Sequence, residues 1–368
     1  MRPGCMQGLS PVGCFPYATT MTSGEPAAVT SQDTRPLLAI TLGDPAGIGP
    51  EIIVKAFAHD DLFDRCRPFV VGDRRMLAQA APWVGRSAPV FEPIDSPNTG
   101  AYRPGTIPVY DLDNADPAGI PIGIASAAAG LAAVQAVYEA CEIAMDGFAD
   151  AIVTAPLNKA AMHMAGFTFP GHTELLAERT GATKVTMLLT APNLRVVHVS
   201  MHVGLREAIR RVTQTRVLDT IHLAAGACRL LGIPNPRIAI AGLNPHASEG
   251  GLFGNQEAVN IIPAIAKARA NGLDVSDPQP PDTVFLRASQ GAYDIVVAMY
   301  HDQGHIPMKL LAFDSGVNVS IGLPIIRTSV DHGTAFDIAG KGIAREESLI
   351  AAIDVAIQMV TARGRPPT

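Results

Sequence analysis

The amino-acid sequence predicts an α/β protein whose sheets are mostly parallel and covered by helices. Short apolar segments typical of buried strands alternate with helical segments over residues 37–368, which is the pattern of β-α-β units. Polar residues recur directly after the apolar segments, at the strand ends where open α/β sheets bind ligands. A chain of 368 residues is too long for one small core, so we expect two domains.

The first half of the chain shows this alternation from residue 37. The apolar run LLAITL is expected to form a buried strand, and the glycine-rich segment GDPAGIGPE to turn the chain into a helix. The expected elements are strands over 37–42, 67–72 and 106–112, helices over 52–57, from Asp73 and over about 122–145, and a strand-turn-helix unit over 149–162.

The second half continues the pattern. The apolar segments 184–190 and 195–202 are adjacent and should form a hairpin over APNL. The amphipathic segment 256–272 is expected to be a helix that ends at Gly272. The other expected elements are a helix from Thr173, one long helix over 205–231, a strand and loop over 237–251, strands over 293–302 and 318–322, and a final helix over about 346–362.

Composition excludes several classes of protein. With 48% hydrophobic and 17% charged residues, the chain is expected to be globular. A net charge of -6 without any basic run argues against a nucleic-acid partner. The five cysteines contain no CxxC pair, which favours neither a disulfide framework nor a cysteine zinc site and suits the cytoplasm. No uncharged apolar run reaches the roughly 18 residues of a membrane span, so no membrane partner is expected.

The N-terminal segment, residues 1–36, differs from the rest of the chain. It lacks hydrophobic periodicity and is rich in Gly, Pro, Ser and Thr. Pro11, Gly13 and Pro16 interrupt any apolar run that a signal peptide would need. We therefore expect a disordered N-terminal extension.

Three histidines follow apolar strands: His202 after RVVHVSM, His246 after RIAIAGLNP and His301 after DIVVAMY. A single histidine is more often structural than a metal ligand, and His198 and His222 are expected to be structural. Three histidines at equivalent strand ends favour one shared site, because three neutral imidazoles leave coordination positions open for substrate or water. The sequence therefore predicts a catalytic site for a divalent metal.

A second group of polar residues suits an anionic ligand. Lys309, Asn318 and Arg327 are separated by strand-like segments that could bring them to one wall of a cleft. Two cations and an amide are suited to a phosphate or carboxylate group, although surface charges are the alternative. His172 and Thr173, at the start of an expected helix, add donors for an anion.

Several segments together make the chain similar to the 4-hydroxythreonine-4-phosphate dehydrogenase (PdxA) family. They are LGDPAGIGPE, GHTE, GLNPHASEGG, YHDQG and GVNVSIGLPIIRTSVDHGTAFDIAGKG. The resemblance covers nearly all of residues 37–368. The loop HGTAFDIAGKGIA also resembles the NAD-binding loop of isopropylmalate and isocitrate dehydrogenases, the wider superfamily. Its glycines permit close approach of the backbone to a ligand, and it lacks the GxGxxG pattern of a standard dinucleotide fold.

The resemblance implies two α/β/α domains with a cleft between them, at 37–150 plus 310–368 and at 151–309. It also implies a homodimer with shared active sites. The metal is expected to be zinc, with Mg, Mn or Co as alternatives, and the cofactor NAD, with NADP as the alternative. By resemblance, metal ligands fall on His202, His246 and His301, substrate contacts on His172, Thr173, Lys309, Asn318 and Arg327, and cofactor contacts on His332, Gly333, Thr334, Ala335, Asp337 and Ile338.

The implied activity is the oxidation, with decarboxylation, of a phosphorylated 3-hydroxy acid such as 4-phosphohydroxy-L-threonine, 4-phospho-D-threonate or 4-phospho-D-erythronate. The segment HDQGHIPMKLLAFD resembles catabolic paralogues more than the vitamin B6 biosynthetic members. His305 and Met308 are therefore expected to line a different end of the substrate. Some relatives act on the cis-dihydrodiol of terephthalate, which is the alternative substrate.

The acid/base group is expected to be a carboxylate. Asp302, adjacent to a metal ligand, is favoured, and Asp282 in PPDTVF is the second choice. Either carboxylate could instead orient a ligand histidine. A metal-dependent phosphoester hydrolase that uses the same histidines is a competing class and would need no nucleotide. A non-catalytic binding protein is a third class, expected to lack the three histidines or Lys309, which are all present.

Overall fold

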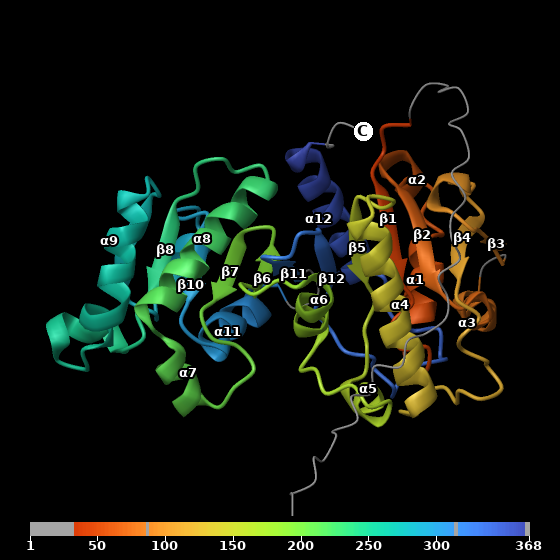
Figure 1. Ribbon diagram of the computed structural model, residues 1–368, viewed down its shortest axis with the longest axis horizontal. Coiled ribbons are helices and arrows are strands. Elements are labelled where there is room, and N and C mark those ends of the chain that lie inside the picture. The colour runs from red at the N-terminus through yellow and green to blue at the C-terminus, as the bar shows by residue number, and fades with distance from the viewer. Residues whose placement is uncertain (1–32, 86–87, 313–315, 365–368) are drawn as a thin grey trace, which may run out of the picture. The chain divides into compact units, whose positions relative to one another are not determined.

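The computed structural model describes residues 33–85, 88–312 and 316–364. The predicted disordered extension, residues 1–36, lies outside this part of the chain except for its last four residues. From Arg35 onward the described chain forms one compact unit. This unit is built around a single sheet of 12 strands (Figure 1). No helix among the described residues is both long and apolar enough to cross a membrane.

The sheet consists of short strands. They are β1 (Leu37–Thr41), β2 (Arg67–Gly72), β3 (Val90–Pro93), β4 (Thr106–Asp111), β5 (Ala151–Thr154), β6 (Thr186–Ala191), β7 (Leu194–His198), β8 (Ile238–Ala241), β9 (Val275–Gln279), β10 (Ile295–Ala298), β11 (Val317–Ile321) and β12 (Arg327–Val330). Their order across the sheet is β3-β4-β2-β1-β5-β12-β11-β6-β7-β10-β8-β9. Neighbours pair in parallel from β3 to β12 and from β7 to β9, whereas β12, β11, β6 and β7 pair antiparallel. The prediction of a mostly parallel sheet is confirmed.

Helices cover the sheet. They are α1 (Gly49–Ala56), α2 (Leu62–Arg65), α3 (Arg74–Ala80), α4 (Ala127–Met145), α5 (Lys159–Met164), α6 (His172–Thr180), α7 (Leu205–Arg211), α8 (Gln214–Leu230), α9 (Ile262–Ala270), α10 (Val284–Ser289), α11 (His301–Leu311) and α12 (Glu347–Arg363). Shorter turns are the 3-10 segments η1 (Ala81–Val84), η2 (Pro97–Thr99) and η3 (Pro245–Gly251) and the π-helical segment η4 (Glu257–Ile261).

Three apolar cores divide between the two faces of the sheet. The largest contains residues of α1, α8 and α12 and runs along one face. A second contains residues of α4 and α6, and a third contains residues of α10 and α11. Strand β1 shows that the faces are opposite, because Leu38 and Ile40 belong to the first core and Leu37 and Ala39 to the second. The expected α/β/α layering is therefore present.

Two expected helices have a different form. Segment 205–231 contains two helices rather than one, and Thr213 separates them. The Thr213 hydroxyl accepts a 3.3 Å hydrogen bond from the backbone N–H of Arg216, so it caps the start of α8. Segment 256–272 opens with the π-helical turn η4, and Pro263 follows in the first turn of α9. Proline lacks an N–H, which interrupts regular α-helical bonding at this point.

The strand expected over 293–302 is shorter than predicted. β10 ends at Ala298, and His301 is the first residue of helix α11. Strand β12 was not expected, because an arginine at its first position, Arg327, does not suit a buried strand. Strands β3 and β9 were not expected either.

The two-domain division stays a prediction. The strands of both expected domains form one continuous sheet. Strand β5, which begins at the expected boundary, pairs with β1 on one side and with β12 on the other.

Candidate active site

Arg327, the first residue of β12, is the central cation of the site. Its side chain is almost fully buried, with 1% exposed. Nη1 donates a 3.0 Å hydrogen bond to Oγ of Ser320, and Nη2 donates a 2.6 Å bond to Oγ1 of Thr154. Burial lowers the pKa of Arg327 to about 9, although the Glu174 carboxylate opposes this shift. Both hydrogen-bond partners of the guanidinium are neutral hydroxyl groups, and its Nε has no partner among the described residues. A buried cation in this state favours an anionic ligand.

Arg327 lines a cavity of about 240 Å³. The cavity lies where the end of β5, both ends of β12, the start of β11, the start of α6 and one residue of α11 come together. Its charged and polar lining includes Lys159, His172, Thr173, Glu174, His202, His305, Asn318, Asp331 and His332. Four of the five predicted substrate contacts are thus brought to one cavity.

Two predicted substrate contacts leave buried polar atoms unpaired. Nε2 of His172 and Oδ1 of Asn318 have no hydrogen-bond partner in the described part of the chain. Burial lowers the pKa of His172 well below its ordinary value, and the charges of Arg327 and Lys159 lower it further. The imidazole is therefore neutral near pH 7. Because buried polar atoms are normally paired, these two atoms indicate a polar ligand.

Lys309 is the predicted substrate contact that does not line this cavity. Its Nζ donates a 3.0 Å hydrogen bond to the backbone oxygen of Asp331 and forms an ion pair with the Asp331 carboxylate. Asp331 itself lines the cavity, so Lys309 lies one residue behind the cavity wall. Lys159, at the start of α5, lines the cavity instead.

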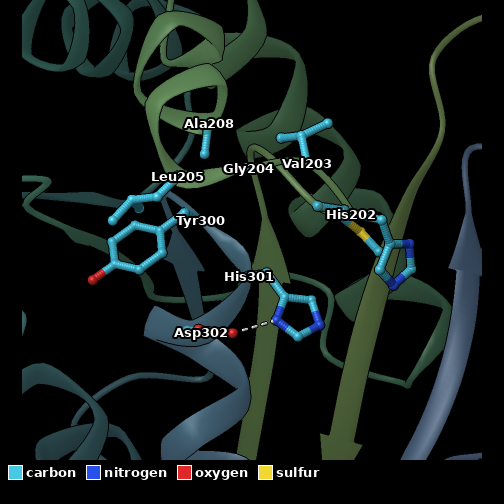
Figure 2. A pocket seen from close by; sticks show the side chains of 9 residues that line it. His202, Val203, Gly204, Leu205, Ala208, Tyr300, His301 and Asp302 are labelled. Carbon is cyan, nitrogen blue, oxygen red and sulfur yellow. Dashed lines mark hydrogen bonds and ion pairs between the residues drawn. The ribbon is translucent and has the colours of Figure 1, made fainter.

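His202 and His301 lie side by side, as Figure 2 shows, one in the segment after β7 and the other at the start of α11. Their ring centroids are 5.6 Å apart. Both border a second cavity, of about 390 Å³. Nδ1 of His301 is 2.7 Å from Oδ1 of Asp302, which leaves Nε2 as the nitrogen available to a metal. Burial lowers the pKa of His202, and Lys159 lowers it further, which favours the neutral imidazole that a metal requires.

His246 lies apart from this pair, in a left-handed turn. Six successive residues have positive φ: 52° at His246, 55° at Ala247, 70° at Ser248, 46° at Glu249, 67° at Gly250 and 104° at Gly251. This conformation costs roughly 1–2 kcal/mol for each residue other than glycine. The His246 side chain is exposed. Across the described residues, no three His, Cys, Asp or Glu side chains are arranged to hold a metal, so one chain does not bring the predicted trio together.

Two further histidines pack beside His301. The ring of His305 stacks on it with centroids 3.7 Å apart and planes 12° apart, and His198 lies 4.8 Å from His305. His305 lines the first cavity, and Met308 is buried in the core, so of the pair expected at the substrate end only His305 lines the cavity. Burial lowers the pKa of His305 to about 4 and that of His198 well below its ordinary value.

The expected cofactor loop borders the first cavity at its start. His332 and Gly333 line the cavity. The backbone N–H of Ile48 donates a 3.1 Å hydrogen bond to the carbonyl of Thr334, which ties the loop to the glycine-rich turn before α1. A Cβ at Gly47 would lie 2.9 Å from Cβ of Thr334, so the close packing requires glycine there. The other four predicted contacts, Thr334, Ala335, Asp337 and Ile338, do not line the cavity.

The two carboxylates expected as acid or base lie in different places. Asp302 is exposed and bonded to Nδ1 of His301, which is the geometry of a carboxylate that orients a ligand histidine. Asp282 is exposed between β9 and α10 and lines neither cavity.

Several residues of the site were not expected from the sequence. Thr154 and Ser320, which hydrogen-bond to Arg327, belong to the apolar strands AIVT and VNVSI. Lys159 and Glu174 also line the cavity. Lys159 directly follows the strand-end segment TAPLN, and Glu174 belongs to the GHTE motif. Their positions next to the end of a strand and the start of a helix were the sequence signal that could have identified them as site residues.

The fold and the cavity define a class of protein: an α/β protein with a buried, unneutralised arginine in a small polar cavity. The family model described as "Pyridoxal phosphate biosynthetic protein PdxA" matches residues 64–356. The D-threonate 4-phosphate dehydrogenase of Cupriavidus necator is 50% identical over 332 residues, which cover 90% of this chain and 99% of that protein. The 4-hydroxythreonine-4-phosphate dehydrogenase of Desulfosudis oleivorans is 49% identical, covering 90% and 98%. The chain belongs to the PdxA family, as the sequence motifs predicted.

Solved structures give the same result. The crystal structure of 4-hydroxythreonine-4-phosphate dehydrogenase from Klebsiella pneumoniae is 46% identical, with a TM-score of 0.81 over 88% of this chain and 99% of that one. A terephthalate 1,2-cis-dihydrodiol dehydrogenase from Burkholderia xenovorans is 33% identical, with a TM-score of 0.63 over 88% and 98%. The fold is therefore shared with both kinds of dehydrogenase.

Proposed function

We propose that the protein is a metal- and NAD-dependent dehydrogenase that oxidises and decarboxylates a phosphorylated 3-hydroxy acid. D-Threonate 4-phosphate and 4-hydroxythreonine-4-phosphate, named for relatives at 50% and 49% identity, are the preferred substrates. The observation that carries the proposal is the buried guanidinium of Arg327, which has hydroxyl partners and lines a cavity.

The phosphate group is proposed to bind beside Arg327. Lys159 supplies a second positive charge, and the unpaired Nε2 of His172 and the N-terminus of α6 supply further donors. These groups surround a volume of about 240 Å³, which is the scale of a small substrate rather than a polymer.

The described residues of one chain supply two of the three ligands proposed for a divalent metal. His202 and His301 would hold it, because both are adjacent imidazoles and Asp302 fixes the tautomer of His301. We propose His246 of a second copy as the third ligand, in a homodimer with shared sites, since His246 does not reach the pair within its own chain. Zinc is the proposed metal.

The chain's own residues bind and orient the substrate in this proposal. When bound, the metal would act as a Lewis acid toward the substrate oxygens, and NAD would accept the hydride. Arg327, Lys159 and His172 hold the phosphate end, and Asp302 keeps a proton on Nδ1 of His301. His332 and Gly333 place the cofactor loop at the edge of the cavity.

The test is a substrate screen with purified protein, NAD and Zn²⁺, followed by the appearance of NADH absorbance. Phosphorylated four-carbon hydroxy acids are expected to give turnover, and terephthalate cis-dihydrodiol is expected to give none. Replacing His246→Ala is expected to abolish turnover. Full activity of that variant in the presence of a chelator would overturn the metal proposal. Release of inorganic phosphate without NAD would instead identify a hydrolase.

A further inference from the structure

The left-handed turn that carries His246 is held by buried polar side chains. Glu257, in the first turn of η4, is 1% exposed. Its Oε1 accepts hydrogen bonds of 2.8 Å from the backbone N–H groups of both Leu243 and Asn244. Its Oε2 accepts a third bond of 2.8 Å, from Nδ2 of Asn244. One carboxylate thus fixes the backbone directly before the turn.

Gln303 joins this segment to helix α11. It is 9% exposed, and its Nε2 donates a 2.7 Å hydrogen bond to the carbonyl of Gly242. Its Oε1 accepts a 2.6 Å bond from the backbone N–H of Met299, directly after β10. Gln303 lies two residues after His301, so one side chain connects the two segments that carry His301 and His246.

The turn folds back on the same anchor. A Cβ at Gly242 would lie 2.7 Å from Cα of Ala247, so glycine is required for the turn to close over residue 242. The carbonyl that Gln303 binds therefore belongs to the residue on which the left-handed turn rests. Gly242 therefore contacts both Gln303 and Ala247, the residue next to His246, so a movement of Gln303 would also move His246.

We propose that Gln303 and Glu257 are positioning residues that fix the relative placement of His246 and His301 within each chain. The inference rests on the proposed function, in which these histidines bind a metal together with the second copy. In a symmetric dimer, each chain would supply His301 to one site and His246 to the other. The two sites have the same geometry only if these histidines are fixed relative to each other within each chain.

The test uses Co²⁺, which has a visible spectrum that depends on ligand geometry, and full-length protein. Gln303→Met keeps the size of the side chain and removes both hydrogen bonds, and Glu257→Gln keeps the shape and removes one acceptor. Each variant is expected to bind Co²⁺ about 10-fold or more weakly, with an altered visible spectrum and reduced kcat. KM for the phosphorylated substrate should stay within about twofold, because neither residue lines the cavity that contains Arg327.

Gln358→Met is the matched control. Gln358 lies in α12, and its Nε2 donates a 2.8 Å hydrogen bond to the carbonyl of Leu231. Neither residue lines either of the two cavities. The Gln358 variant should lose stability to a similar degree while its Co²⁺ affinity and spectrum stay unchanged. If the wild-type protein binds no Co²⁺, both the proposed function and the positioning role fail. If the wild-type protein binds Co²⁺ and the Gln303 and Glu257 variants bind it equally, only the positioning role is overturned.

Discussion

Nη2 of Arg327 donates a 2.6 Å hydrogen bond to Oγ1 of Thr154 across two neighbouring parallel strands. The bond places a cation inside the sheet, where burial lowers its pKa. The two hydroxyl groups accept hydrogen bonds from Nη1 and Nη2 but do not neutralise the charge, and Nε has no partner among the described residues. The folded protein therefore carries an electrostatic cost without a ligand. An anion that enters the cavity would remove this cost, which couples stability to binding.

Replacing Arg327→Gln should separate stability from anion binding. Because the variant removes a buried charge, its melting temperature without ligand should be unchanged or higher. Its affinity for inorganic phosphate, measured by calorimetry, should fall roughly 100-fold because a charge-assisted bidentate contact is lost.

Arg195→Gln is the matched control for this experiment. Arg195 is half-buried and, like Arg327, has an unpaired Nε among the described residues, but it donates to the backbone oxygen of Asp294 and lines neither cavity. It should lower the melting temperature without changing phosphate affinity. Unchanged phosphate binding in the Arg327 variant would contradict the assignment of the anion site.

The proposed metal site, shared between two copies of the chain, makes a prediction about mixed dimers. Neither His202→Ala nor His246→Ala alone should turn over substrate. After unfolding and refolding an equal mixture, half of the dimers should be mixed, and each should carry one intact site made of His202 and His301 from one copy and His246 from the other. Activity should recover to about a quarter of the wild-type value. Recovery is measured by NADH formation, and its absence would mean that each site is built within one chain.

The sequence predicted the apolar strands well, because runs such as LLAIT and IVVA are buried on both faces of a parallel sheet. It predicted Arg327 as a substrate contact but did not predict β12, because a charged residue is rarely buried in a strand without partners such as the hydroxyls of Thr154 and Ser320. Whether such a residue is buried in a strand depends on side chains of strands that are distant in the sequence.

The sequence predicted which residues line the site more accurately than it predicted their contacts. His172, Thr173, Asn318 and Arg327 do line one cavity, as expected. Lys309 does not, because Asp331 binds it, and an ion pair between residues 22 positions apart has no local sequence signal. The left-handed turn at His246 was also not predictable, since Ala247, Ser248 and Glu249 rarely adopt positive φ.

The strain in this turn gives a stability prediction. Ala247 has φ of 55°, which glycine adopts freely, so Ala247→Gly should leave the free energy of unfolding unchanged or raise it by up to about 1 kcal/mol. Ala351→Gly, in the second turn of α12, should lower the free energy of unfolding by about 1 kcal/mol. Urea unfolding of both variants measures the difference. Equal destabilisation would show that the turn is not strained at residue 247.

Asp44 is a buried carboxylate in the glycine-rich turn before α1. It is 0% exposed, and its Oδ1 accepts a 2.9 Å hydrogen bond from the backbone N–H of Ala46. The backbone N–H groups of Ala46 and Asn158 favour the charged carboxylate, but burial has the larger effect on its pKa. Burial raises the pKa of Asp44 from 3.8 to about 6.

Replacing Asp44→Asn should therefore stabilise the protein in a pH-dependent way. Between pH 3.8 and about 6 the folded chain holds a proton on Asp44 that the unfolded chain releases, so the wild-type free energy of unfolding falls as pH rises. The cost of the buried charge is fully present above that range. Asparagine is neutral and keeps the bond to Ala46, so the variant should be more stable by roughly 2 kcal/mol at pH 8 and by little at pH 4. Urea unfolding across this range measures the difference, with the exposed Asp60→Asn as a control that should show no such trend. A stability gain independent of pH would mean that the charge on Asp44 is not its cause.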